Sequence, residues 1–324
     1  MLSRIAESLH WMSRYLERAD NTARMLQINL LFLLEAEDSL PSDAQWRPLL
    51  NITGSEELYF EIYPDGEVTA QRVIEFLTRD RANTGSIRNS LRVARENARA
   101  LRDRISKEMW EAINELWLTA SDRLKMPLIP ERATPFYALI RDEVARFHGI
   151  TMSTMMRGEA FSFYTLGTFL ERADMTARIV DVKYHLLLPD LSMVGSPLDY
   201  YQWAALLKSL SGFEAYRRRY QAGPRPLDVA AFIIFDPDFP RSLRFGVDRM
   251  EQALRKINPD AEQGLSWDAL REIHQLLDKT TPKEVFQRGL HEFLELFLER
   301  VSAFHSALAV DYFEAHAEET LCVI

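Results

Sequence analysis

The chain has 324 residues, of which 47% are hydrophobic and 27% are charged, a balance that is typical of a globular protein and excludes a disordered one. Its formal net charge of −9 opposes non-specific binding to nucleic acid. Cys322 is the only cysteine, and no apolar run is long enough for a signal peptide or a membrane span, so we expect a cytoplasmic protein without disulfides.

Apolar residues at spacings of three and four predict a first helix from Ser3 to about Ala36, and short helices are expected between residues 38 and 66. Periodicity and proline positions predict further helices at residues 69–78, 86–124 (one long helix or two in series), 135–156, 159–187, 200–210, 227–235, 240–257, 267–279 and 282–313. No alternating strand pattern stands out, and only 12 glycines and 14 prolines interrupt the chain. We therefore predict an all-α helical bundle in one domain, residues 1–324, with pseudo-symmetric halves at about 1–130 and 131–324 as one option.

A nine-residue segment occurs twice in the chain. Residues 16–24 recur as residues 170–178 with eight of nine positions identical, and each copy contains a Glu-Arg-Ala-Asp box. Recurring apolar residues would serve a core, but recurring charges are harder to explain, because solvated charges can usually be exchanged at little cost. The repeat predicts either two related halves or two helices that face one another.

The charged residues of the two boxes are the first candidate ligand-binding residues: Glu17, Arg18, Asp20, Arg24, Glu171, Arg172, Asp174 and Arg178. At about 100° per residue, Glu17, Asp20 and Arg24 fall within a narrow arc, whereas Arg18 points to the other side of the apolar stripe. The second box repeats this pattern. Two interpretations are open: ion-pair networks that lock two long helices together, or a polar pocket between the helices that both glutamates line.

A second set of charges follows one face of the helix predicted after residue 86. Its five arginines alternate by four and three positions: Arg88, Arg92, Arg95, Arg99 and Arg102. They repel one another unless carboxylates or an anionic ligand balance them, and Glu96 lies in the same turn. The carboxylates of the two boxes are the natural internal partners. A phosphate or carboxylate ligand is the alternative, because guanidinium groups bind both in bidentate geometry.

Three smaller features bear on function. Pro240 is expected in the first turn of a helix, where Arg241 and free N–H groups would hold an anion; an ordinary capped helix start is the alternative. Glu7 and His10 give one Glu-x-x-His spacing, but a di-iron bundle needs two, so no metal site is predicted. There is neither a phosphate-binding loop with Lys-Ser/Thr nor a Gly-x-Ser-x-Gly elbow, which argues against an NTPase or an α/β-hydrolase.

Several segments together resemble the alpha-E family, a bacterial all-helical family without an assigned reaction. The resemblance rests on residues 1–19, residues 86–87, residues 94–99 leading into Trp110-Glu111 and Asn114, the second Glu-Arg-Ala-Asp box, Trp203 with Leu206-Leu207, and residues 239–242. It covers nearly the whole chain. Thr84-Gly85 departs from the pattern, since the family often has Asn-Pro before this Ser-Ile.

The family is typically encoded beside a circularly permuted ATP-grasp protein and a transglutaminase-like peptidase. The resemblance therefore implies an accessory or co-catalytic subunit of an ATP-grasp amidoligase system that acts on a peptide- or amino-acid-like substrate, with ATP and magnesium bound only by the partner ligase. The first four arginines of the second set would hold an acyl-phosphate, phosphate or carboxylate group, and Glu17 and Glu171 would hold an amine or act as a base. The alternatives are an independent carboxylate-rich enzyme, with or without a metal, and a purely structural interaction module.

Overall fold

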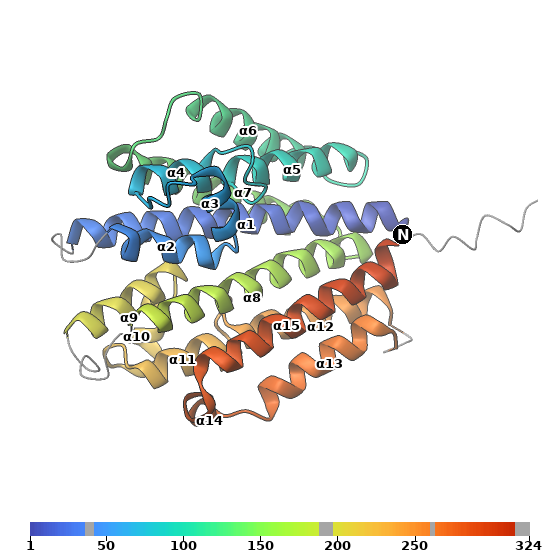
Figure 1. The fold of residues 1–324 in the computed structure, drawn as a ribbon. Coiled ribbons are helices and arrows are strands. Elements are labelled where there is room, and N and C mark those ends of the chain that lie inside the picture. The colour runs from blue at the N-terminus through green and yellow to red at the C-terminus, as the bar shows by residue number, and fades with distance from the viewer. Residues whose placement is uncertain (36–41, 188–196, 260–262, 315–324) are drawn as a thin grey trace, which may run out of the picture.

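The computed structural model describes residues 1–35, 42–187, 197–259 and 263–314, and within these ranges the chain forms α-helices and no strand (Figure 1). In chain order the helices are α1 (Ser3–Glu35), α2 (Ser42–Ile52), α3 (Glu56–Ile62), α4 (Ala70–Thr78), α5 (Ile87–Ala100), α6 (Lys107–Arg123), α7 (Pro130–Thr154), α8 (Glu159–Leu187), α9 (Pro197–Ser209), α10 (Phe213–Tyr220), α11 (Pro226–Phe235), α12 (Leu243–Ile257), α13 (Leu265–Asp278), α14 (Pro282–Arg288) and α15 (Leu290–Leu308), followed by a π-helical turn at Ala309–Phe313. The predicted all-α fold is confirmed. None of the described helices is both long and apolar enough to cross a bilayer. Cys322 lies outside the described residues.

Helices α1 and α8 run parallel through the middle of the molecule (Figure 1). At their N-terminal ends the amino group of Met1 lies 3.1 Å from the Glu159 carboxylate. About four turns further on, Arg18 of α1 binds Glu171 of α8. Because both contacts join residues separated by a similar interval of sequence, the two helices must run in the same direction.

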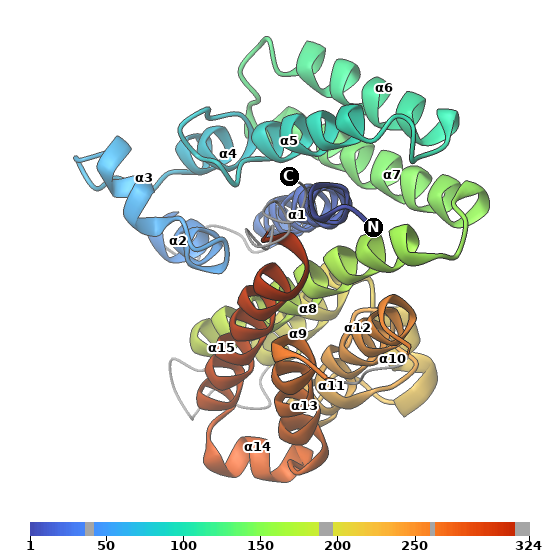
Figure 2. The same cartoon turned by 90° about the vertical axis from the view of Figure 1, so that its right-hand side faces the viewer.

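Each central helix carries its own set of packed helices. Helices α5 and α7 pack on α1, whereas α12 and α15 pack on α8 (Figure 2). Most of the apolar stripe predicted for α1 is buried in this arrangement, and Leu9, Leu16 and Leu26 are 0% exposed. Burial of such a side chain contributes about 1.5–3 kcal/mol. The hydrophobic core is therefore centred on the α1–α8 pair.

Several helix boundaries differ from the sequence predictions. Helix α7 begins at Pro130, five residues earlier than predicted, and contains Pro135 in its second turn. Residues 282–313 do not form one helix, because Gly289, with a φ of +110°, separates α14 from α15. Helix α10 was not predicted, since its short, arginine-rich sequence shows little apolar periodicity.

Serine caps define the starts of three helices that the sequence placed less sharply. The region predicted at residues 86–124 forms two helices in series, α5 and α6, capped by Ser86 and Ser106. Each serine hydroxyl accepts a hydrogen bond from the backbone N–H three residues further on. Ser242 caps α12 in the same way, so this helix begins at Leu243 and Pro240 lies outside it.

Candidate functional site

The two Glu-Arg-Ala-Asp boxes exchange ion pairs across the α1–α8 interface. Glu171 accepts hydrogen bonds from Arg18 Nε at 2.6 Å and from its Nη2 at 3.1 Å. In return, Glu17 accepts from Arg172 Nε at 3.1 Å and from its Nη2. Both glutamates are 1% exposed. Each is therefore a buried charge that a guanidinium from the other helix neutralises in bidentate geometry.

Each buried glutamate has one further partner. Arg14 Nε donates to Glu171 at 2.8 Å, and His148 Nε2 lies 3.0 Å from Glu17. Burial on its own raises the pKa of Glu171, but its two arginine partners outweigh burial and hold the pKa at about 2. The pKa of Glu17 is also well below its usual value, because its arginine and histidine partners outweigh burial. Both glutamates are consequently ionised at neutral pH.

The aspartates of the boxes pair with arginines one turn later in the same helix. Asp20 accepts from Arg24 Nε and Asp174 accepts from Arg178 Nε, both at 2.8 Å. The two pairs differ in their surroundings, because the side chain of Asp20 is 4% exposed and that of Asp174 is 20% exposed. The second pair therefore faces more open space.

Arg241 precedes the serine-capped start of α12 and binds side chains of α1. Its Nη2 donates to Asp20 and its Nη1 to Asn21, both at 2.8 Å, and its side chain is 11% exposed. Burial lowers the pKa of Arg241 to about 10, although the charge of Asp20 opposes this shift. The guanidinium is thus the internal partner of a box carboxylate.

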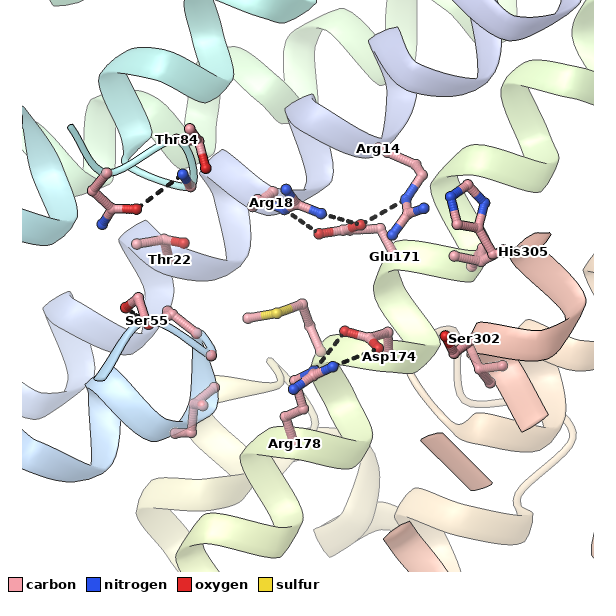
Figure 3. Close-up of a pocket in the computed structure, with 18 of the residues that line it drawn as sticks. Arg14, Arg18, Thr22, Ser55, Thr84, Glu171, Asp174, Arg178, Ser302 and His305 are labelled. Atoms are coloured by element: carbon pink, nitrogen blue, oxygen red, sulfur yellow. Dashed lines mark hydrogen bonds and ion pairs between the residues drawn. The ribbon is translucent and has the colours of Figure 1, made fainter. Parts of the chain in front are cut away.

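A cavity of about 520 Å³ lies beside the Arg18–Glu171 pair (Figure 3). Its wall comes from α1, α8 and α15, from the end of α2 and the start of α3 with the loop between them, and from the loop that precedes α5. The ionisable side chains that line it are Arg14, Arg18, Glu171, Asp174, Arg178 and His305. Small-molecule sites commonly measure about 300–1,000 Å³. An ion-pair network therefore forms one wall of a polar pocket, which Glu171 lines and Glu17 does not.

The cavity has an excess of positive charge. Three arginines face two carboxylates, and His305 adds no charge near pH 7, because burial lowers its pKa to about 4. In addition, Arg14 Nη1 is buried without a hydrogen-bond partner among the described residues. A buried donor left unpaired is costly, so this guanidinium calls for an acceptor.

The five arginines predicted to share a helix face lie on α5, except Arg102, which follows its last residue. Arg95 Nε donates to Asn114 of α6 at 2.8 Å, and its Nη1 donates to Glu96 at 2.8 Å. The guanidinium groups of Arg102 and Arg95 lie 5.0 and 5.6 Å from the ring centroid of Trp110, also in α6. The predicted pairing of these arginines with the box carboxylates is wrong, because the arginines of the boxes already bind those carboxylates.

The other arginines of this face, Arg88, Arg92 and Arg99, do not line the cavity either. Arg92 and Arg99 are exposed, and Arg99 lies 3.6 Å from Glu96. Partial burial and the neighbouring charges of Arg81 and Arg92 lower the pKa of Arg88. The face is therefore a separate, largely surface feature of the molecule.

Two of the ionisable residues that line the cavity were not singled out as candidate site residues from the sequence. Arg14 stands one helical turn before Arg18, so a spacing of four already places both on one face of α1. His305 belongs to α15, and no sequence pattern relates that helix to α1. The first residue could have been found by periodicity, whereas the second required the tertiary structure.

A stacked histidine pair adjoins the cavity. The rings of His305 and His10 have centroids 5.5 Å apart and an interplanar angle of 9°. His10 is 0% exposed and also packs against Trp11 and Phe313, and burial lowers its pKa well below 6.5. It is thus an aromatic core residue and not part of a metal site with Glu7. In the described part of the chain, no three His, Cys, Asp or Glu side chains are grouped to hold a metal ion.

The histidine pair makes stability depend on pH. In the unfolded chain an imidazole takes up a proton as the pH falls below about 6.5, but folded His305 does so only near pH 4, and the pKa of His10 is also lowered. The unfolded state binds more protons in this window, so we expect the free energy of unfolding to fall as the pH is lowered from about 6.5 to 4. His305→Gln should show a shallower fall. Urea unfolding across this range measures both, and parallel curves for the two proteins would contradict the assignment.

The fold and the site define an all-α protein whose two parallel central helices exchange ion pairs between buried glutamates and arginines. The chain belongs to the Alpha-E family, described as a predicted alpha-helical domain with a conserved ER motif, and the family model matches residues 1–313. The reciprocal pairs Glu17–Arg172 and Glu171–Arg18 give a physical reason for such a motif, because the loss of either partner leaves a charge in the core.

Three relatives are uncharacterized mycobacterial proteins, one from Mycobacterium bovis and two from strains of Mycobacterium tuberculosis. Each is 22% identical to this chain over 325 residues, which covers 94% of the chain. The chain spans 35% of the length of these relatives. No solved structure matches it.

Proposed function

We propose that this chain is a ligand-binding accessory subunit of an ATP-grasp amidoligase system in the bacterial cytoplasm. The observation that carries the proposal is the cavity of about 520 Å³, with its excess positive charge, beside the ion pair of Arg18 with the buried Glu171. Its ligand is a peptide- or amino-acid-like molecule that presents an anionic group to the arginines. ATP and magnesium bind to the partner ligase.

The charge of the cavity favours a carboxylate or phosphate group on the ligand. Arg18 binds Glu171 through Nε and Nη2, which leaves its Nη1 as a further donor, and the guanidinium of Arg14 adds to the positive charge of the same wall. Hydrogen bonds between guanidinium groups and anions are about twice as strong as neutral ones, and partial exclusion of water strengthens them. An anionic group would therefore complete the hydrogen bonding of this wall.

The two buried glutamates support binding better than proton transfer. An efficient general base has a pKa near the working pH, whereas the pKa of Glu171 is about 2 and that of Glu17 is also lowered. Both carboxylates are enclosed by cationic partners. We therefore assign them to the positioning of Arg18 and Arg172, in place of the catalytic role considered from the sequence.

The length of the relatives supports a role beside other domains. The mycobacterial proteins extend well beyond the region that matches this chain, which is about a third of their length. The additional chain is where a linked partner domain would lie. Together with the family resemblance, this favours a circularly permuted ATP-grasp protein as the partner of the present chain.

Affinity purification from the native host at native expression, followed by mass spectrometry, tests the partnership. We expect stoichiometric recovery of an ATP-grasp protein, and ATP hydrolysis by the recovered complex that depends on an added amino acid or peptide. An unrelated helical bundle with the same tag serves as the control bait. Recovery of the chain without any ATP-grasp protein in repeated preparations would contradict the proposal.

A further inference from the structure

The turns before α5 and α12 have the same hydrogen bonds at equivalent positions. Ser86 Oγ donates to the backbone oxygen of Asp80, and Ser242 Oγ donates to that of Asp236. Each serine also caps the helix that follows it. The two aspartates are 156 positions apart in the sequence, and so are the two serines. Position 85, just before the first serine, therefore corresponds to position 241.

A second correspondence extends the relation beyond these turns. The hydroxyl groups of Tyr59 and Tyr216 donate to backbone oxygens seven or eight residues further on. Each ring also lies 4.7 Å from that of a tyrosine four residues later, Tyr63 and Tyr220 respectively. These pairs are 157 positions apart, close to the interval between the turns. The first half of the molecule can therefore be compared with the second, residue by residue, near the cavity.

This comparison relates the cavity to a buried arginine. In the second half the guanidinium of Arg241 binds Asp20 and Asn21 and occupies the space beside them. In the first half the corresponding position is Gly85, which has no side chain and lines the cavity. The counterpart of Asp20 in the repeated box is Asp174, which also lines the cavity. The cavity is thus the place where an arginine side chain at position 85 would lie.

The aspartate of a box can accept hydrogen bonds from two guanidinium groups, as Asp20 shows. Asp20 Oδ2 accepts from Arg24 Nε and from Arg241 Nη2, both at 2.8 Å. Asp174 accepts from Arg178, at 2.8 Å from Nε and 3.3 Å from Nη2, and is more exposed than its counterpart. An ionised carboxylate offers about four lone-pair positions. Asp174 can therefore accept a second guanidinium, which Gly85 does not supply.

We propose that the ligand of the cavity supplies this guanidinium, so that an arginine side chain or arginine-like small molecule binds Asp174 as Arg241 binds Asp20. The inference rests on the proposed function, in which the cavity is a ligand site, and it names the substrate class. The cavity already carries excess positive charge, so the same ligand must bring a carboxylate, which faces Arg18 and Arg14. Met175 of α8 occupies the box position that Asn21 occupies in α1. A guanidinium in the cavity therefore has one side-chain acceptor fewer than Arg241 has.

Isothermal titration calorimetry of the full chain with three related probes tests this assignment. L-arginine has both charged ends, L-citrulline replaces the guanidinium by a neutral group of similar shape, and agmatine lacks the carboxylate. We expect citrulline and agmatine each to bind at least about ten-fold more weakly than arginine. Equal affinity for citrulline would overturn the inference and leave the proposed function standing. Absence of binding by all three would also overturn the inference. It would leave the proposed function standing, because that proposal is tested by the recovery of an ATP-grasp protein.

A Gly85→Arg variant tests the location of the site. The backbone of Gly85 is not in the left-handed region, and an added Cβ would meet only Asn83 Oδ1, at 3.3 Å. The new guanidinium should reach Asp174, close the cavity and weaken arginine binding at least about ten-fold without lowering the melting temperature. Gly149→Arg is the matched control, because it adds the same charge at an exposed position of α7. Unchanged arginine affinity in folded Gly85→Arg would overturn the inference.

Discussion

Replacement of Glu171 by alanine is expected to lower the free energy of unfolding by about 3–5 kcal/mol. This carboxylate is 1% exposed and binds Arg14 and Arg18, so its removal leaves two guanidinium groups near the core without a neutralising charge. Glu17→Ala should act in the same direction, because Arg172 then loses its bidentate partner. Urea unfolding at pH 7, followed by circular dichroism, measures both losses.

Glu96→Ala is the matched control for these variants. The side chain of Glu96 is 45% exposed and pairs with Arg95 at the surface, where such a pair contributes about 0–1 kcal/mol. Glu171→Gln keeps the volume and removes the charge, so it should lose less stability than the alanine variant. If Glu171→Ala cost no more than Glu96→Ala, the buried network would not be what holds the two central helices together.

The pairing of the two boxes was predictable from the sequence because the boxes are self-complementary. Each box places its glutamate on one side of an apolar stripe and the following arginine on the other. When two such helices pack in parallel, opposite sides meet, as at the e and g positions of a parallel coiled coil. Glu17 then meets Arg172, and Glu171 meets Arg18. The recurrence of charged residues in the sequence follows from this reciprocity.

The cavity could not be predicted in the same way. Gly85 lies in a loop, Asp174 in α8 and His305 in α15, and only tertiary packing brings them to one place. The arginines of α5 give a stronger sequence pattern, yet part of their face is covered by Trp110 and Asn114 of α6. Periodicity shows which residues share a face of a helix, but it does not show which neighbour covers that face. The sequence therefore drew attention both to the box arginines Arg18 and Arg178, which line the cavity, and to the α5 arginines, which do not.

Gly167, at the contact between α1 and α8, is a second residue whose role the sequence alone does not reveal. In a helix interior, glycine is normally less favourable than alanine by about 0.5–1 kcal/mol, so the sequence alone marks this position as a weakness of α8. In the structure, a Cβ at Gly167 would lie 2.2 Å from the backbone oxygen of His10 and 2.2 Å from Ser13 Oγ, both in α1. The missing side chain is what allows the two helices to approach closely.

We therefore expect Gly167→Ala to lower the free energy of unfolding by about 1–3 kcal/mol, the reverse of the usual effect of this change, because α1 and α8 must move apart. Gly149→Ala in α7 is the matched control: nothing lies within 4 Å of its added Cβ, so it should stabilise the protein by about 0.4–1 kcal/mol. Adding Ser13→Gly to Gly167→Ala should give at most partial recovery, since the contact with the His10 backbone remains. Urea unfolding of these chains measures the differences. If Gly167→Ala and Gly149→Ala stabilised the protein equally, α1 and α8 would not be in close contact at Gly167. Close approach would then not be what fixes the geometry of the ion pairs between them.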